Sequence, residues 1–396
     1  KNNMKISKVK LIAFISTMLV SVDVLSVAGL RVTLLPLFLY GGYIFIKNNY
    51  IDKWAFFALT FSVLCLPSLF FSAEFYKSVG YLVWIFFNYI ALCVVYKSLI
   101  VRSLDNTLLG VRDAYRFQIF LGCLLYFSGL QPRAAVLYYE PSYFALSLTP
   151  YVVMVVSSYI KSKGYVGDVV KRTSFIDVFL LLAAIYTTKS ANLMLVCALS
   201  VLIISFLGKG KLKKICILAV VGTISIFGLY FYSQNSNDLI AVTINNLFSA
   251  SDPVKALLDR TGNRWPRFNL AYDISLSNFW GVGIGAYEKY TLSHTFAGYT
   301  GLPFYLSPIG YPPINIYLEL ASTCGWLALA VWLIWHFKMI KAANKRPVGG
   351  PVIVCSLIVA MLALFIESSF MRPYYWMLMG MVMGQIALNK RARQNS

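Results

Sequence analysis

The chain has 396 residues, of which 59% are hydrophobic and only 13% are charged. A soluble domain carries roughly 45–50% and about 25% of these residues, so the composition excludes a soluble protein. It predicts a single all-α integral membrane domain over residues 1–396. The net charge of +20 is scattered between apolar runs, which argues against a nucleic-acid partner. The seven cysteines lie inside apolar runs without metal or redox spacing, so we expect neither a metal nor a cofactor.

Apolar runs suited to membrane helices recur along the whole chain. A spanning helix needs about 20 largely apolar residues, and shorter runs serve when they pack against neighbours. On this basis we predict about twelve spans, near residues 10–30, 32–46, 54–73, 79–96, 117–130, 142–160, 174–188, 191–207, 215–233, 314–337, 351–368 and 373–388.

The distribution of basic residues predicts how these spans are oriented. With a cytoplasmic N-terminus, 25 of the 35 Lys and Arg residues fall in cytoplasmic segments. Short cytoplasmic loops carry an excess of Lys and Arg, so both termini are predicted to be cytoplasmic. The long polar interval at 233–313 then faces outward. Apolar residues at helical spacing over 240–248 predict a short amphipathic helix on the membrane surface there.

Five short outer loops each carry one basic residue against this trend, namely Arg31, Lys77, Arg133, Lys189 and Arg372. Arg133 lies before the span at 142–160, and Lys189 lies in a hairpin with the sequence Thr-Thr-Lys-Ser-Ala-Asn. A turn lysine that snorkels to the interface explains Lys189 as well as a functional contact does. Both explanations remain open at this point.

Glu140 stands directly before the span at 142–160. Pro141 follows it, which suits a first helical turn, and a carboxylate there is favoured by the helix dipole. Helix capping could therefore explain Glu140. The functional alternative is that desolvation among aromatic residues raises its proton affinity toward that of a useful base. Those aromatic residues are Tyr138, Tyr139, Tyr143 and Phe144.

The densest polar chemistry lies in the outer loop, where Arg260, Arg264 and Arg267 are close in sequence. Pro266 lies among them, at a place where a helix could begin. A helix N-terminus flanked by arginines is a natural anion site. The alternative is a solvated interfacial helix whose basic residues meet lipid phosphates.

The glycine-rich sequence Gly-Val-Gly-Ile-Gly at 281–285 resembles a dinucleotide fingerprint only superficially. No strand–helix context surrounds it. We interpret it as a tight turn against the helical bundle.

Polar residues also lie at the edges of the last spans. Asn315 and Glu319 are four residues apart and share a helix face, which sets an acid shallowly within a span. Arg372 follows Glu367 closely enough for a local ion pair, and we favour this explanation over a functional site.

Several short motifs, in this order, resemble the Wzy-type O-antigen polymerases, in a superfamily that also contains the O-antigen ligases. The motifs span about residues 138–335, with one long outer loop before the last three spans. They are Tyr139-Glu140-Pro141-Ser142-Tyr143-Phe144-Ala145, Thr188-Lys189-Ser190, Gly262-Asn263-Arg264-Trp265, Phe279-Trp280-Gly281-Val282-Gly283-Ile284-Gly285, and Asn315-Ile316-Tyr317-Leu318-Glu319-Leu320 with Gly325.

The resemblance implies a GT-C-like glycosyltransferase of the bacterial inner membrane, with a periplasmic active site, in lipopolysaccharide biosynthesis. It would join O-antigen repeat units carried on undecaprenyl pyrophosphate, without a metal. The implied partners are this lipid-linked oligosaccharide as donor and acceptor, membrane lipids and a chain-length regulator. Related ligases carry a histidine where this chain has Ile314, which favours a polymerase. The alternatives are an O-antigen ligase and a non-enzymatic lipid-oligosaccharide flippase or transporter.

The resemblance and the chemistry together suggest roles for individual residues. Arg264, with Arg260 or Arg267, would hold a diphosphate and stabilise its developing charge. Glu140 is the first candidate for the base that assists the acceptor hydroxyl, and Glu319 is the second. The remaining predicted substrate contacts are Lys189, Arg133 and Asn315.

Overall fold

The computed structural model describes residues 2–23, 26, 27, 30–48, 52–159, 174–207, 234, 245, 246, 249–252, 262–344, 350–368 and 370–394. Up to residue 159 the elements are α1 (Asn2–Val20), β1 (Ser26–Val27), β2 (Leu30–Arg31), η1 (Val32–Leu34), α2 (Leu35–Asn48), α3 (Lys53–Cys65), η2 (Leu66–Phe71), α4 (Phe75–Asn88), η3 (Tyr89–Val94), α5 (Val95–Arg102), α6 (Leu104–Phe127), α7 (Pro141–Ser147) and α8 (Thr149–Tyr159). The later elements are α10 (Phe175–Thr188), α11 (Ala191–Leu207), α15 (Arg264–Ser277), α16 (Tyr287–Ser293), η4 (Ala297–Tyr299), α17 (Ile316–Cys324), α18 (Trp326–Ala343), α19 (Val352–Ala363) and α20 (Pro373–Gln394).

The predicted all-helical class is confirmed, apart from a hairpin in which β1 and β2 pair antiparallel. Within the described residues, three segments are long and apolar enough to cross a membrane: Lys53–Phe71, Phe75–Arg102 and Trp326–Ala343. Four shorter apolar helices accompany them, Val32–Asn48, Phe175–Thr188, Ala191–Phe206 and Val352–Ala363. The count of twelve spans and the GT-C likeness stay predictions. The predicted span at 215–233, most of the surface helix at 240–248, and Arg260 lie outside the described residues.

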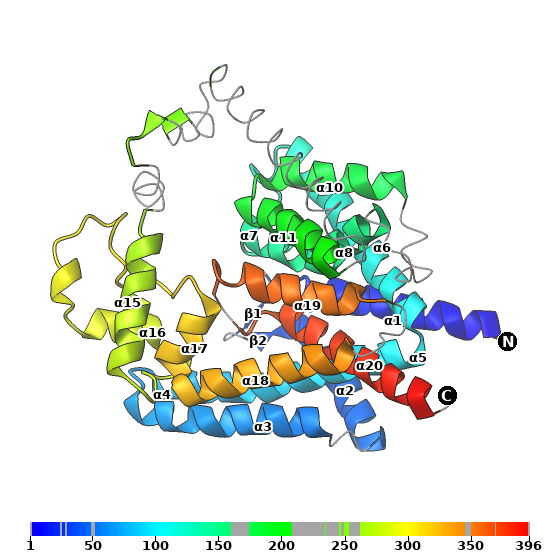
Figure 1. The fold of residues 1–396 in the computed structure, drawn as a ribbon, viewed down its shortest axis with the longest axis horizontal. Helices are drawn as coiled ribbons and strands as arrows, with labels where there is room; N and C mark the ends of the chain where they lie inside the picture. Colours follow the sequence, from blue (N-terminus) through cyan, green and yellow to red (C-terminus); the bar gives the residue numbers. More distant parts are fainter. Residues whose placement is uncertain are drawn as a thin grey trace.

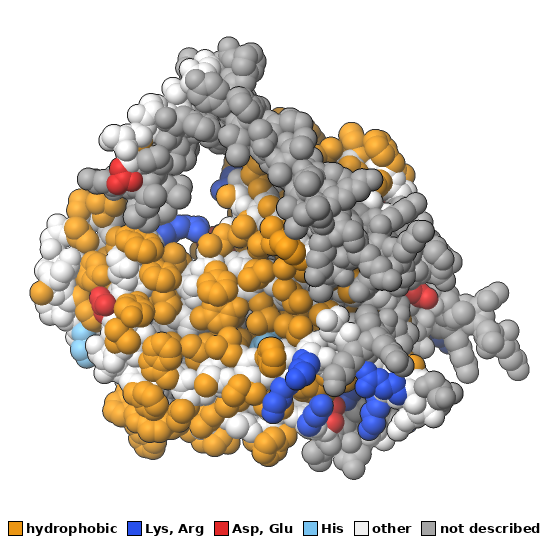
Figure 2. Space-filling view, viewed as in Figure 1, with side chains coloured by type: hydrophobic (Ala, Val, Ile, Leu, Met, Phe, Trp, Pro, Cys, Tyr) orange, Lys and Arg blue, Asp and Glu red, His pale blue; other side chains and the backbone are white. Residues whose placement is uncertain are grey.

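The helices are arranged so that α1 begins and α20 ends at one end of the molecule, while α15 and α16 lie at the opposite end (Figure 1). Figure 2 shows that hydrophobic side chains cover the face formed by α3, α4 and α18. Phe56 on α3, Val83 on α4 and Phe337 on α18 are exposed. An exposed apolar surface of this extent fits contact with lipid.

The predicted span at 314–337 is divided into α17 and α18 at Gly325. This glycine has φ +92°, and an added Cβ would lie 2.7 Å from the carbonyl oxygen of Phe279. The backbone of the 281–285 turn causes the break, because Val282 N donates to Ser322 O and Trp326 N donates to Phe279 O. The interpretation of 281–285 as a tight turn against the bundle is therefore confirmed.

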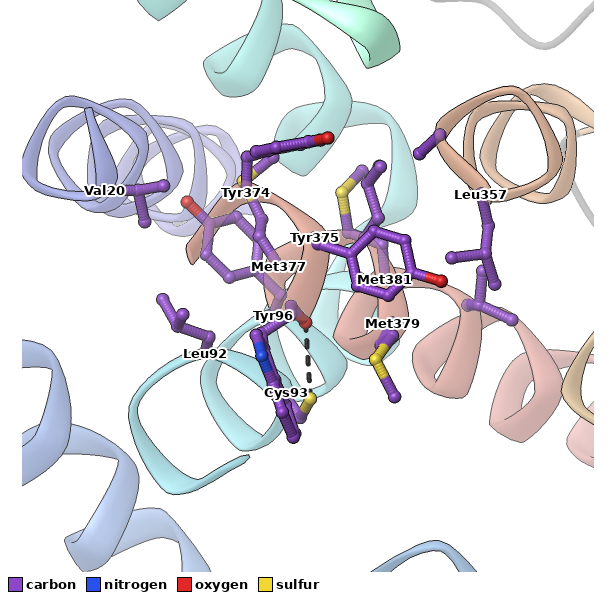
Figure 3. Packing of buried hydrophobic residues seen from close by; sticks show 14 of the residues in the cluster. Val20, Leu92, Cys93, Tyr96, Leu357, Tyr374, Tyr375, Met377, Met379 and Met381 are labelled. Atoms are coloured by element: carbon purple, nitrogen blue, oxygen red, sulfur yellow. Dashed lines mark hydrogen bonds between the residues drawn. The ribbon is translucent and has the colours of Figure 1, made fainter. Parts of the chain in front are cut away.

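The core lies where α20 packs against η3 and α5. Figure 3 shows methionine and tyrosine side chains of α20, including Tyr374 and Met377, beside Leu92 and Tyr96. Gly380 permits the close approach, since an added Cβ there would lie 2.7 Å from the Cα atom of Cys93. This contact fixes α20, and with it the turn that precedes the helix.

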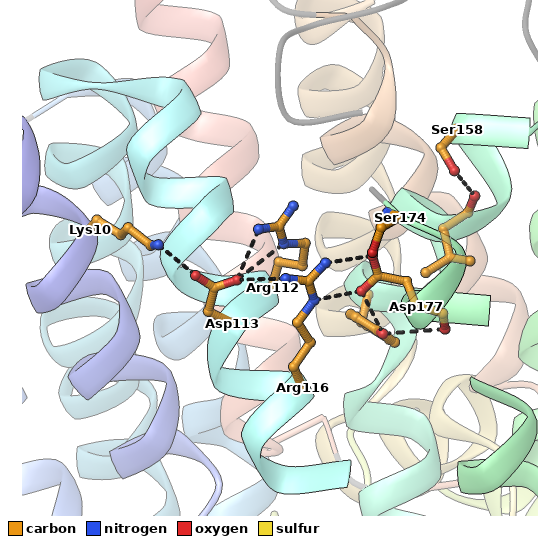
Figure 4. A network of polar contacts seen from close by, with 9 residues as sticks. Lys10, Arg112, Asp113, Arg116, Ser158, Ser174 and Asp177 are labelled. Carbon is orange, nitrogen blue, oxygen red and sulfur yellow. Dashed lines mark hydrogen bonds and ion pairs between the residues drawn. The ribbon is translucent and has the colours of Figure 1, made fainter. Parts of the chain in front are cut away.

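A compact ion network joins α1, α6, α8 and α10 (Figure 4). Lys10 lies 2.6 Å from Asp113, and Arg116 reaches Asp177 through two bonds of 2.6 Å. The side chain of Asp177 is 0% exposed and also accepts a hydrogen bond of 2.9 Å from the Tyr151 hydroxyl. These short, saturated pairs hold the helices in register.

Candidate functional site

Helix α15 carries two of the predicted arginines at its first turn. It begins at Arg264, with Pro266 in that turn, as the sequence predicts. The helix is held to the bundle by a small core that includes Leu270 and Ile274, and by a 2.8 Å bond from Trp326 Nε1 to Ser275 O. The position of both arginines is therefore fixed by packing further along α15.

Glu367 forms the centre of a polar cluster between α15 and the bundle. Its Oε1 lies 3.9 Å from Arg264 Nη2, and its Oε2 lies 3.9 Å from Arg372 Nη2. Asn192, at the start of α11, donates a hydrogen bond of 2.9 Å to Oε1. The Glu367 side chain is 14% exposed, whereas that of Arg264 is 48% exposed. One carboxylate thus joins three segments that are distant in sequence.

Arg372 completes the inner side of this cluster. Its guanidinium carbon lies 3.4 Å from the ring centroid of Tyr143, and its Nε donates to Ser368 O at 3.1 Å. A cation held against an aromatic face and a carbonyl keeps a defined orientation. Tyr143 lies on α7, one turn beyond Glu140, and so connects the arginine cluster to the predicted base.

Arg267 lies at the outer side of the cluster. Its Nε donates to Pro312 O at 2.8 Å, and its guanidinium lies 5.7 Å from the Tyr311 ring centroid. Burial lowers the pKa of the Arg267 guanidinium, the nearby charge of Arg264 lowers it further, and Glu367 opposes both. A bound anion would favour the charged form of this partly buried guanidinium.

Glu140 differs from its prediction in one respect. It occupies the N-cap position of α7 without a side-chain capping bond, and its Oε2 accepts a 3.0 Å bond from the Ser142 hydroxyl. The expected desolvation is wrong, because the Glu140 side chain is exposed even though Tyr138 and Phe144 are buried. Glu140 therefore faces outward at the mouth of the bundle, where an acceptor could reach it.

Arg133, in the loop between α6 and α7, is hydrogen-bonded to the turn that carries Lys189. Arg133 Nε donates to Thr188 O at 2.9 Å, and Arg133 Nη2 donates to Lys189 O at 3.0 Å. Lys189 adopts a left-handed conformation with φ +47°, and its Nζ lies 5.3 Å from the Tyr126 ring centroid. These contacts stabilise the α10–α11 turn, which positions Asn192. Contact of either residue with substrate stays a prediction.

Asn315 connects α17 to the segment that carries Glu367. Its side-chain oxygen caps α17 by accepting from Tyr317 N and Leu318 N, and its Nδ2 donates to Phe365 O at 3.0 Å. Asn315 thus has a structural role: it ties the start of α17 to Phe365, two residues before Glu367. Glu319 is half-buried one turn along the same helix, and its role stays a prediction.

The central position of Glu367 was not predicted from the sequence. The local pair with Arg372 was expected and is present at 3.9 Å, but the approach of Arg264 was not expected. A signal was available, since an acid at the end of an apolar run usually faces a cavity or a partner. Asn192 and Tyr143 carried no comparable signal. No group of three or more His, Cys, Asp or Glu residues in the described ranges is arranged to hold a metal.

Residues 176–333 match the family model described as O-Antigen ligase. The match covers less than half of the chain and shows that this region is similar to that family. The apolar helices fit a membrane protein. No curated protein matches the chain. The matched region contains Lys189, Asn192, Arg264 and Arg267, and it ends before Glu367.

Proposed function

We propose that this protein is an O-antigen polymerase, a glycosyltransferase that joins repeat units carried on a polyprenyl diphosphate. The observation that carries the proposal is the approach of Arg264 and Arg372 to one carboxylate, with Arg267 in the same first turn of α15 as Arg264. Arginine presents a rigid fork of donors that matches phosphate oxygens. In this proposal Arg264 and Arg267 bind the donor diphosphate from the loop side, and Arg372 binds it from the bundle side.

The reaction requires stabilisation of the negative charge on the leaving diphosphate and a group that accepts the proton of the acceptor hydroxyl. The bond between the anomeric carbon of the donor sugar and the phosphate oxygen breaks, and a bond from that carbon to the acceptor hydroxyl oxygen forms. Fixed guanidinium groups stabilise the negative charge on the leaving diphosphate. The Glu140 carboxylate accepts the proton of the acceptor hydroxyl, and Glu319 is the second candidate for this role.

The proposal places the reaction at the periplasmic face of the inner membrane. Two observations support this orientation. The Lys and Arg distribution favours cytoplasmic termini, and α15 lies at the opposite end of the molecule from both chain ends (Figure 1). Blue side chains line the hollow beside α15, as expected for a surface that attracts an anionic lipid headgroup (Figure 2).

A ligase is the second candidate, and the description of the matched family favours it. A ligase would transfer the glycan to lipid A-core instead of to another repeat unit. Ile314, where the resembling ligases carry a histidine, favours the polymerase.

The deciding experiment is incubation of the purified protein with defined lipid-linked repeat units, followed by gel analysis. A polymerase produces a ladder of products from these units alone. Products that form only after addition of lipid A-core would identify a ligase. Absence of any product with either acceptor, from protein that is folded in detergent, would reject both activities.

A further inference from the structure

We infer that Glu367 is a positioning residue that acts as an internal counter-anion: it orients Arg264 and Arg372 and competes with the product diphosphate for them. This inference rests on the proposed function and adds a mechanism for product release to it. Glu367 touches neither reacting sugar in this scheme.

The Glu367 carboxylate is held by one residue and faces two others. Each oxygen faces a different guanidinium, Oε1 toward Arg264 and Oε2 toward Arg372, both at 3.9 Å. Asn192, which is buried, fixes Oε1 by a 2.9 Å hydrogen bond. The carboxylate is therefore anchored by a neutral donor and not by the arginines. Its charge orients the guanidinium groups without saturating them.

The ion-pair distances leave room for a stronger ligand. Charge-assisted bonds between guanidinium and oxygen are normally about 2.7–2.9 Å long, so both pairs around Glu367 are loose. A phosphate oxygen can approach Arg264 more closely than Glu367 does. Bound phosphate and Glu367 would then be like charges at short range, and their repulsion weakens the grip on the ligand.

This repulsion acts more strongly on product than on substrate. In the donor, the outer phosphate is esterified by the sugar. After transfer it becomes a terminal phosphate, whose second ionisation near pH 6 adds up to about one further negative charge at neutral pH. Three guanidinium groups alone would hold this more highly charged product more tightly than the donor. Glu367 offsets that preference and so favours release.

The test compares inorganic pyrophosphate binding to the purified wild-type protein and to Glu367→Gln, an isosteric change that removes only the charge. We expect pyrophosphate to bind roughly 3- to 10-fold more tightly to the variant, as measured by calorimetry in detergent at low salt. In the polymerisation assay, KM and kcat should both fall, because release of product becomes slower. Glu288→Gln, a matched change at an exposed carboxylate on α16, should leave all these values unchanged.

A purely structural role for Glu367 gives a different result. The variant would then have a lower Tm, a higher KM and weaker pyrophosphate binding, and this outcome overturns the inference. So does unchanged pyrophosphate affinity in a folded variant. If Glu367→Gln fails to fold, Asn192→Asp provides the opposite test. It places a second negative charge beside Oε1, so pyrophosphate affinity should change in the opposite direction. Pyrophosphate binding should then weaken by a similar factor at an unchanged Tm, whereas unchanged affinity, or weaker binding with a lower Tm, overturns the inference.

The wild-type protein distinguishes failure of this inference from failure of the proposed function. Wild-type protein that makes no ladder and binds no pyrophosphate contradicts the proposed function itself. Wild-type protein that does both, with a Glu367→Gln variant that binds pyrophosphate no more tightly, contradicts only the role of Glu367.

Discussion

Two polar clusters built from the same residue types lie in different parts of this protein and differ in geometry. In the cluster around Asp177, Arg116 forms two bonds of 2.6 Å and the carboxylate is 0% exposed. In the cluster around Glu367, both arginine contacts are 3.9 Å and Arg264 is 48% exposed. Saturated pairs have no remaining capacity for a ligand, whereas loose pairs retain donors that can bind one. Geometry, and not residue type, therefore separates a structural network from a candidate site.

The largest expected effect of a single change is on activity, at Arg264. We expect Arg264→Ala to lower kcat/KM for polymerisation about 10²- to 10³-fold, because a fixed donor to the leaving diphosphate is lost. The Tm should change little, since a half-exposed pair at 3.9 Å contributes about 0–1 kcal/mol. The measurement is the rate of ladder formation at matched protein level.

Arg391→Ala provides the control, because this arginine is exposed near the end of α20, at the other end of the molecule. It should polymerise at the wild-type rate. Full-length ladders from Arg264→Ala at normal protein level would remove Arg264 from the site.

The next largest effect should be on stability, at Asp177. Asp177→Asn keeps the shape of the side chain but removes the buried charge that Arg116 pairs with at 2.6 Å, and leaves Arg116 only its longer pair with Asp113 at 3.4 Å. We expect a loss of about 2–3 kcal/mol in the free energy of unfolding, seen as a lower Tm in detergent. The kcat of the protein that remains folded should be unchanged. A lower kcat at an unchanged Tm would mean that this network, too, takes part in the reaction.

The two clusters also show what the sequence could and could not predict. The sequence predicted features that depend on neighbouring residues alone. Pro266 marks the first turn of α15, and the glycines at 281–285 form a turn against the bundle. The break at Gly325 was missed, because it results from hydrogen bonds with the distant 279–283 segment. A long apolar run carries no sign of such a contact.

The candidate site was only partly predictable for the same reason. The sequence predicts an anion site at Arg260, Arg264 and Arg267, but no sequence pattern indicates that α15 docks beside Glu367. The partial desolvation considered for Glu140 was wrong, because aromatic neighbours in sequence do not determine which way a side chain points at a helix start. Tyr138 turns inward and Glu140 turns outward within three residues.

The smallest effect is expected at Glu140, where the comparison is between a catalytic carboxylate and a capping one. General-base assistance typically raises a reaction rate by about 10²- to 10⁴-fold. Because a diphosphate is already a good leaving group, we expect Glu140→Gln to lower kcat by only about tenfold. KM for the lipid-linked donor should change little, because the arginines bind the diphosphate. Steady-state kinetics with a defined donor separates the two constants.

Glu74→Gln is a matched control, because Glu74 also occupies an N-cap position, that of α4, without a side-chain capping bond. If Glu140 acted only on the helix dipole, both variants would lose about 0.5 kcal/mol of stability and keep the wild-type kcat. A tenfold loss of kcat confined to Glu140→Gln, with both proteins equally stable, would instead assign the proton transfer to the outer mouth of the bundle. The loose arginine cluster would then bind the donor, and the exposed carboxylate on α7 would activate the acceptor.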